Sequence, residues 1–508
     1  MDKNAIKKYA VWARRELIEK VSQKAMQFGI EDKKELDPDL ESINGILLSE
    51  EEKKQRQALV RRITLDGYSQ VIEEVAYTWF NRFIALRFME VNGYLPSHVR
   101  VFTDENNEFK PQIMVEALHL EFSCIDKSVV IDLKQSNRDD ELFKYLLIGQ
   151  CNELSSILPG MFQRISDYTE LLLPDYLLRS GSVIEQMIHN IPEEDWKEQV
   201  QIIGWLYQDY NTEPKDIVFA ELKKNKKITK DKIPAATQIF TPEWVVKYMV
   251  ENSLGRFYKN NSTDKEQFNN WKYYIDDDND SSDKKILDPS QIKCIDPCMG
   301  SGHILCYMFD VLVEIYEAYG FSARDAASSI VENNLFGLDI DDRAAQLAYF
   351  AVMMKARQYD RRFFTRNIQP NVLVIRESNS IDRDALNYFC NNDSQLSESV
   401  STLCQELQDA KTFGSAIRTK DIDLAIIMHR IEEVSNDISI YKSYVESEII
   451  PMLKAGMIMT DKYDVVVTNP PYMGINGMDL KLADFCKDNY ETSKSDLCTV
   501  DGKIIGYA

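Results

Sequence analysis

The tetrapeptide Asn469-Pro470-Pro471-Tyr472 carries the most specific chemistry in this sequence. It follows the apolar, β-branched run 463–468, which predicts a buried strand that ends abruptly at the carboxyl edge of a sheet, where open α/β sheets bind ligands. Two prolines stiffen the backbone and remove two amide donors, which leaves the Asn469 side-chain oxygen and the Pro470 carbonyl as rigid acceptors. With the flat ring of Tyr472, this arrangement suits the amino group of a flipped adenine. A strand followed by a proline-rich turn is the alternative for these residues taken alone.

A second segment, IDPCMGSG at 295–302, predicts a strand, a turn with two glycines and then a helix over 303–319. Gly300 and Gly302 leave room where a Cβ would collide with a nucleotide-like ligand. The segment has neither the G-x-G-x-x-G pattern nor GK[ST], so neither NAD nor ATP is indicated. His303, at the start of the helix, is a candidate catalytic residue by type, but packing or a backbone contact is the favoured interpretation.

Two further strands are predicted to contribute residues to the carboxyl edge of the same sheet. Asp339 closes the strand after the glycine turn, where an acidic residue can bind both ribose hydroxyls of a nucleoside. Ile340 is placed to pack on an adenine ring. A third strand, 371–375, leads to Glu377 and Asp382, either of which could contact the amino group of that ring.

The run TQIFTP at 237–242 contains a helix-start signal. Pro242 is predicted at the first helical position, with Thr241 as the cap and Glu243 behind it. A ligand carboxylate could bind the Thr241 hydroxyl and the free amides at that positive helix end.

The composition of the chain limits the ligands and partners that it can bind. With 508 residues, the chain is long enough for several domains, and its net charge of −22 argues against coating nucleic acid by bulk electrostatics. Any DNA contact must use a local patch, and the lysine-rich run 221–232 is a candidate, with a solvated linker as the alternative. The nine cysteines have no C-x-x-C spacing, so we expect reduced thiols and no metal site. The sequence has neither a long apolar run nor a signal peptide, which predicts a soluble, cytoplasmic protein without membrane contact.

The pattern along the chain predicts an α/β core behind a helical N-terminal domain. Apolar residues recur at helical steps over 5–28, and the acidic stretch 260–285 is interpreted as a mobile surface insertion. The predicted buried positions of the first helix are Ile6, Tyr9, Ala10, Ala13, Leu17, Val21 and Ala25. The predicted division is a helical domain at 1–220, a cofactor-binding part at 221–382, a helical insertion at 383–455 and a catalytic segment at 456–508.

The motifs TQIFTP, DPCMGSG, GLDID and NPPY, in this order, resemble the gamma-ordered adenine-specific DNA methyltransferases that use S-adenosylmethionine. The N-terminal half, including AIKKYAVWARRELIEKVSQKA and VAYTWFNRFIALRFMEVNGYLP, is similar to the PglX methyltransferases of BREX phage-defence systems. The likeness extends to about Thr499.

The resemblance implies a Rossmann-like methyltransferase core acting on adenine in double-stranded DNA. It also implies other BREX proteins as partners, with methylation marking host DNA as self. The resemblance implies that Thr241 meets the methionine carboxylate, Asp296 and Gly300 the amino-acid end, and Asp339 the ribose. Pro297, Gly302 and Ile340 complete the predicted cofactor-binding residues. The implied catalytic residues are Asn469, Pro470, Pro471 and Tyr472, which would hold the target base.

The resemblance also has a limit. Relatives continue with further strands and a target-recognition region, whereas the residues 501–508 do not match the family, so we expect a partial sheet and a chain that is truncated relative to the family. One alternative is a restriction-modification fusion, since Asp209, Asp216 and Glu221-Leu222-Lys223 faintly resemble a nuclease pattern. Another is an inactive subunit that binds DNA or a partner.

Overall fold

The computed structural model forms two compact units, Met1–Thr212 and Glu213–Ala508. The described residues are 1–34, 36–43, 45–163, 167–238, 240–262, 271–275, 288–420 and 422–500. Ile239, most of the acidic stretch 260–285 and the segment 501–508 lie outside the described residues, and with them the expectations stated for these parts.

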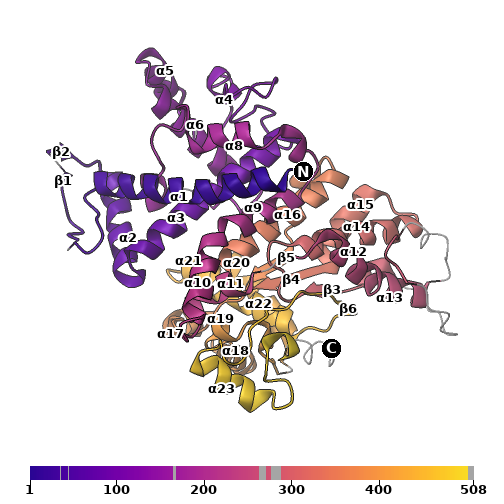
Figure 1. The fold of residues 1–508 in the computed structure, drawn as a ribbon. Helices are drawn as coiled ribbons and strands as arrows, with labels where there is room; N and C mark the ends of the chain where they lie inside the picture. The colour runs from indigo at the N-terminus through magenta and orange to yellow at the C-terminus, as the bar shows by residue number, and fades with distance from the viewer. Residues whose placement is uncertain are drawn as a thin grey trace. The chain divides into compact units, whose positions relative to one another are not determined.

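The first unit consists mainly of α-helices (Figure 1). Helix α1 (Lys3–Gln27) packs against α3 (Tyr68–Val91), α8 (Val183–Asn190) and α9 (Gln201–Tyr210). Its buried residues are those predicted from the helical spacing. Aromatic side chains of α3, such as Trp79 and Phe80, are fully buried and form the core of this unit. The remaining elements are β1 (Ser42–Ile43), β2 (Ile46–Leu47), α2 (Glu50–Asp66), α4 (Gln112–Val115), α5 (Lys127–Gln135), α6 (Asp139–Leu154) and α7 (Tyr168–Leu171).

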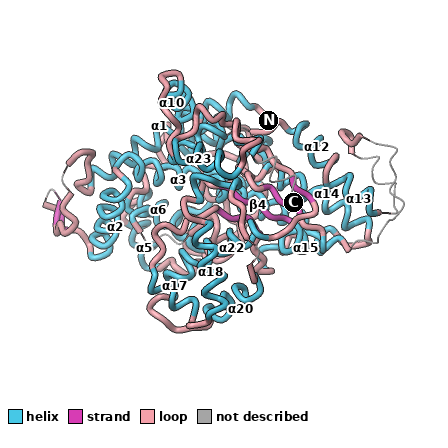
Figure 2. Tube along the Cα trace, turned by 90° about the horizontal axis from the view of Figure 1, so that it is seen from below, coloured by secondary structure: helices cyan, strands magenta, loops and turns pink. Residues whose placement is uncertain are grey.

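A four-stranded parallel sheet lies in the second unit, with the strand order β5-β4-β3-β6 (Figure 2, magenta). Its strands are β3 (Cys294–Asp296), β4 (Leu335–Asp339), β5 (Asn371–Val374) and β6 (Val465–Val466). Ile295 pairs with Phe336 on one side and with Val466 on the other. The chain therefore runs outward from β3 to β5 and returns to the far side of β3. Ligands bind at such a reversal of strand order, at the carboxyl ends of the strands.

Helices cover both faces of this sheet. On one face, α14 (His303–Ala318) packs closely against β4. A Cβ at position 337 would lie 2.5 Å from the Met299 side chain and 2.7 Å from the Leu305 side chain, so this position has room only for glycine. Because side chains alternate along a strand, Leu338 points to the opposite face, where it joins a buried cluster with helices of 383–455. This segment thus packs directly on the sheet and belongs to the same compact unit.

The other helices of the second unit surround this core. They are α10 (Thr212–Leu222), α11 (Ile233–Thr237), α12 (Glu243–Glu251), α13 (Leu254–Asn261), α15 (Ala323–Ser329), α16 (Asp342–Tyr359), α17 (Arg383–Cys390), α18 (Ser394–Glu406), α19 (Ala410–Phe413), α20 (Leu424–Ser435), α21 (Lys442–Tyr444), α22 (Ile450–Thr460) and α23 (Leu480–Asn489). Within the described part of the chain, no helix is both long and apolar enough to cross a bilayer.

Candidate active site

The glycine turn follows β3 and is tied to the end of β4. The Met299 amide donates to the Leu338 carbonyl at 3.0 Å, and the Gly300 amide donates to Asp339 Oδ2 at 2.9 Å. Both glycines have positive φ, +53° at Gly300 and +80° at Gly302, a region that other residues enter at a cost. The turn predicted from the sequence is therefore present, and hydrogen bonds hold it against Asp339.

The two glycines have different surroundings. A Cβ at Gly302 would lie 3.0 Å from the Ala348 backbone in α16, whereas a Cβ at Gly300 would have open space around it. Gly302 is thus required for packing between the turn and α16, and Gly300 borders a space in front of the turn. The open space is where a ligand could approach the backbone.

Replacing Gly302 by alanine is expected to lower the free energy of unfolding of the second unit by about 2 kcal/mol, from backbone strain and the clash with Ala348. The matched change Gly300→Ala adds strain without a clash and is expected to cost about 1 kcal/mol. Denaturant unfolding of both variants measures the difference. A Gly302 variant as stable as the natural protein would contradict the packing described here.

Asp296 and Asp339 place two carboxylates at neighbouring strand ends. Asp296 is fully buried, and its Oδ1 accepts a hydrogen bond from the Cys298 amide at 3.1 Å. Its Oδ2 lies near the buried Thr468 hydroxyl without a well-directed hydrogen bond. Burial raises the pKa of Asp296 to about 7, and the nearby Asp339 contributes to the rise. Asp296 thus carries an unsatisfied acceptor at the carboxyl edge of β3.

The Asp339 carboxylate holds its own loop as well as the glycine turn. Its Oδ1 accepts from the Asp341 amide at 2.8 Å, while its Oδ2 accepts from Gly300. Partial burial raises the pKa of Asp339 to about 7, and these amide bonds oppose part of the rise. Ile340, the next residue, is half-buried, and its Cγ2 would lie 3.3 Å from a Cβ at Gly414.

Thr241 and Asn469 meet although they lie far apart in the chain. Asn469 Nδ2 donates to Thr241 Oγ1 at 3.0 Å. The predicted helix start was wrong in detail, because α12 begins at Glu243 with Pro242 in extended conformation at the cap position and no side-chain cap. The Thr241 hydroxyl therefore faces Asn469 instead of capping the helix.

The segment 469–472 projects from the carboxyl edge beyond β6. The Val467 amide still donates to the Ile295 carbonyl at 3.1 Å, so the chain stays beside β3 almost to Asn469. Pro470 and Pro471 are half-buried, and the Tyr472 side chain is 53% exposed. The tetrapeptide thus lies at the sheet edge that also carries Asp296.

The residue that holds the loop after Tyr472 was not predicted from the sequence. Asp496 Oδ1 accepts from the Met473 amide at 3.2 Å and from the Cys498 amide at 3.1 Å. The Leu497 amide donates to the Met473 carbonyl at 3.1 Å, which ties the loop to 495–497. An aspartate that binds the amide two residues on is a recognisable turn signal. That signal does not reveal which distant segment shares the carboxylate.

A second missed element is the short turn Gly414–Ala416. Cys298 Sγ and Ser415 Oγ lie 3.1 Å apart, and a Cβ at Gly414 would lie 3.3 Å from Ile340 Cγ2. This part of 383–455 therefore lies beside both the glycine turn and the end of β4.

Glu377 and Asp382, the two residues predicted to contact the amino group of the adenine ring, have different surroundings. Asp382 caps α17, because its Oδ1 accepts from the Asp384 amide at 2.8 Å and the Ala385 amide at 3.0 Å. Glu377 instead forms an ion pair with Lys230, and among the described residues its Oε2 has no hydrogen-bond partner. His303 stacks on Phe240 with ring centroids 4.6 Å apart, in keeping with its interpretation as a packing residue.

Most lysines of the run 221–232 contact other groups of the same chain. Four of its six lysines bind groups of the same chain, which limits the run as a phosphate-binding patch. The contacts join Lys226 and Lys232 to Glu221, Lys227 to the Asn476 carbonyl, and Lys230 to Glu377. Glu221, part of the faint nuclease pattern, is thus engaged by two lysines.

Comparison with known proteins finds relatives that match almost the whole chain. It is 36% identical over 98% of its length to the adenine-specific methyltransferase BrxX of Escherichia coli O9:H4 (strain HS), and 38% identical over 98% to the adenine-specific methyltransferase PglX of Lacticaseibacillus casei (strain Zhang). The chain is homologous to adenine-specific methyltransferases of the BrxX and PglX type. It spans 44% and 45% of the length of these BrxX and PglX relatives.

Two further matches agree with this homology. Residues 333–500 match the family of Eco57I restriction-modification methylases, and this range contains Asp339 and Asn469. A putative type II restriction enzyme and methyltransferase of Methanocaldococcus jannaschii is 21% identical over 63% of the chain and 28% of its own length.

Proposed function

We propose that this chain forms the cofactor-binding and base-binding part of a site-specific DNA adenine N6-methyltransferase that uses S-adenosylmethionine. The observation that carries the proposal is the hydrogen bond between Asn469 and Thr241, which joins the proposed base pocket to the proposed cofactor site. The strand order and the carboxylates at the ends of β3 and β4 support a Rossmann-like arrangement of these sites. Similarity to adenine-specific methyltransferases supports the reaction.

The residues at this edge fit the parts of the cofactor. The buried Asp296, with an unsatisfied oxygen, suits the cofactor ammonium, and Asp339 suits the ribose hydroxyls. The open space at Gly300 leaves room for the amino-acid end, beside Pro297 and Gly302. When bound, S-adenosylmethionine supplies an activated methyl group on a sulfonium.

The residues proposed to bind the carboxylate and the adenine of the cofactor are chosen by their positions in the fold. Thr241 is proposed to meet the methionine carboxylate, and Ile340 to pack on the cofactor adenine. Glu377 is the better candidate for the adenine amino group, since Asp382 is engaged as a helix cap.

The chain's own residues prepare the target base. Its amino nitrogen is a poor nucleophile, because the lone pair is delocalised into the ring. Acceptors at the Asn469 side chain and the Pro470 carbonyl would favour a more tetrahedral nitrogen, while Tyr472 stacks on the base. The protein's main contribution is alignment of this nitrogen with the methyl group, which can supply several kcal/mol.

The biological setting is proposed from the relatives' names and the sequence resemblance. A BREX phage-defence system would use the methylation to mark host double-stranded DNA as self, with other BREX proteins as partners. The methyl acceptor would be an adenine flipped out of a short asymmetric site.

Incubating the complete natural protein with unmethylated DNA and tritium-labelled S-adenosylmethionine tests the proposal. Label should enter DNA and be recovered as N6-methyladenine after digestion. Label on cytosine, or Mg²⁺-dependent cleavage without methylation, would contradict it. Cofactor binding without transfer would support a non-catalytic subunit instead.

Thr241→Val is expected to lower the methylation rate about tenfold, because loss of the hydroxyl removes a hydrogen bond to the Asn469 amide. Thr241→Ser keeps the hydroxyl and serves as the matched control, with activity near that of the natural protein. Single-turnover rates at saturating cofactor separate this effect from weaker cofactor binding. Equal rates in the valine and serine variants would show that the contact is dispensable.

A further inference from the structure

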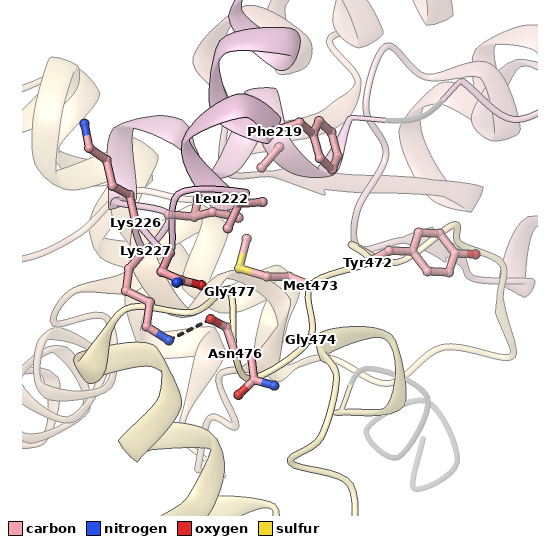
Figure 3. A pocket seen from close by; sticks show the side chains of 12 residues that line it. Phe219, Leu222, Lys226, Lys227, Tyr472, Met473, Gly474, Asn476 and Gly477 are labelled. Carbon is pink, nitrogen blue, oxygen red and sulfur yellow. Dashed lines mark hydrogen bonds between the residues drawn. The ribbon is translucent and has the colours of Figure 1, made fainter.

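A pocket of about 610 Å³ lies beside the segment 469–472 within the second unit (Figure 3). Phe219 and Leu222 of α10 lie on one wall, and Met473 and Asn476 on the other, with Tyr472 at one end. The volume is large enough for a nucleotide and falls in the range of small-molecule sites.

Hydrogen bonds join the two walls of this pocket. Lys227 Nζ donates to the Asn476 carbonyl at 2.6 Å, and the Ile228 amide donates to the Gly477 carbonyl at 3.0 Å. Ile228 also forms a parallel bridge with Met478. These contacts fix the position of 226–228 relative to 476–478 and so define the shape of the pocket.

The target adenine is not the occupant of this pocket. Its amino group must reach Asn469 and Pro470, and neither residue lines the pocket, which begins at Tyr472. A ligand in the pocket would contact Tyr472 and residues of the segment that follows it in the chain, 473–477. In a DNA strand, this position suits a nucleotide next to the flipped base.

The lining suits a base and its phosphate. The Phe219 side chain is 44% exposed on a helix, so a base can stack on it without disturbing the core. Lys226 is 63% exposed and bonds Glu221 at 3.3 Å, a surface ion pair that a phosphate can replace. The Asn476 side chain adds an amide that can hydrogen-bond a base edge.

We infer that this pocket binds the nucleotide adjacent to the target adenine in the same strand. Phe219 provides the stacking surface and Lys226 the phosphate contact. The inference rests on the proposed function, because Asn469 defines the position of the target base. The pocket would then contribute to the choice of sequence around the methylated adenine.

Photocrosslinking tests the inference with an oligonucleotide of alternating deoxyadenosine and 5-iododeoxyuridine. Whichever adenine enters the base pocket, a 5-iodouracil lies next to it, and mass spectrometry of the protein should find crosslinks at Phe219 or Met473. Crosslinks confined to residues outside 219–228 and 472–477 would overturn the inference.

Binding measurements on variants with matched controls complete the test. Phe219→Ala should weaken oligonucleotide binding about tenfold, whereas Ile217→Ala, at a 58% exposed position of the same helix outside the pocket, should not. Lys226→Gln should reduce affinity and its salt dependence more than Lys224→Gln. If Phe219→Ala and Ile217→Ala bind equally well while adenine methylation proceeds, the inference fails and the proposed function stands. If no adenine methylation occurs in the natural protein, the proposed function fails first.

Discussion

Replacing Asn469 by alanine is expected to lower the rate of adenine methylation by about 10²–10³-fold and to leave the affinity for S-adenosylmethionine within about threefold. The side-chain oxygen is proposed to accept a hydrogen bond from the target amino group as the nitrogen becomes nucleophilic. The Asn469 amide also donates to Thr241, so the alanine variant loses the contact that orients this acceptor. Single-turnover methylation by the complete natural protein measures the rate, and calorimetry measures cofactor affinity.

The control is Asn489→Ala, which removes an exposed amide that donates to the Phe485 carbonyl at 2.9 Å on α23. This variant should methylate DNA at the natural rate. An Asn469 variant that retains more than about a tenth of the activity would show that another group accepts the amino hydrogens.

Asp296→Asn is expected to weaken S-adenosylmethionine binding about 10- to 100-fold and, above pH 7, to stabilise the unliganded protein. The first effect follows from the loss of a charged partner for the cofactor ammonium. The second follows from burial, because the native state holds an ionised carboxylate with an unsatisfied oxygen out of water. A variant that binds the cofactor more weakly but unfolds less readily identifies a carboxylate that serves ligand binding. A carboxylate that supports the fold would lower both the affinity and the stability when it is replaced.

The pH dependence of stability follows from the pKa of Asp296, which burial raises from 3.8 to about 7. Between about pH 4 and pH 7 the native state binds more protons than the unfolded state, so its stability falls as the pH rises through this window. At pH 8 the penalty is fully present, and Asp296→Asn should relieve about 2 kcal/mol or more of it.

Denaturant unfolding at pH 6 and pH 8 measures this difference. The natural protein should lose stability between the two values, and the asparagine variant should lose less. Asp339 retains its own raised pKa in both proteins, so part of the pH dependence remains. An asparagine variant that is less stable than the natural protein at pH 8 would contradict the burial argument.

Local patterns predicted the elements that carry the site. The helical spacing of Ile6, Tyr9 and Leu17 identified the buried face of α1, since one face of an isolated helix is already defined by its period. The glycine turn and the acidic ends of β3 and β4 were predicted for a similar reason. Strand, turn and helix signals lie within a few residues of one another, and backbone sterics fix their conformation.

Tertiary structure decided which of these elements meet. Thr241 was predicted as a helix cap from its neighbours, yet Pro242 occupies the cap position of α12 and the Thr241 hydroxyl faces Asn469. The lysines of 221–232 were a phosphate candidate in sequence, and the fold gives Lys230 and Lys227 the distant partners Glu377 and the Asn476 carbonyl. No local signal encodes a partner far along the chain.

By itself, the sequence determined that a rigid acceptor pair, a glycine turn and strand-end carboxylates exist in this protein. Only the tertiary structure placed β6 beside β3, brought Asn469 to Thr241 and used Asp496 to hold the loop after Tyr472. The physical reason is that turns and strand ends follow from local sterics and hydrophobic period, whereas the pairing of distant segments depends on strand register and on the burial of whole sheet faces.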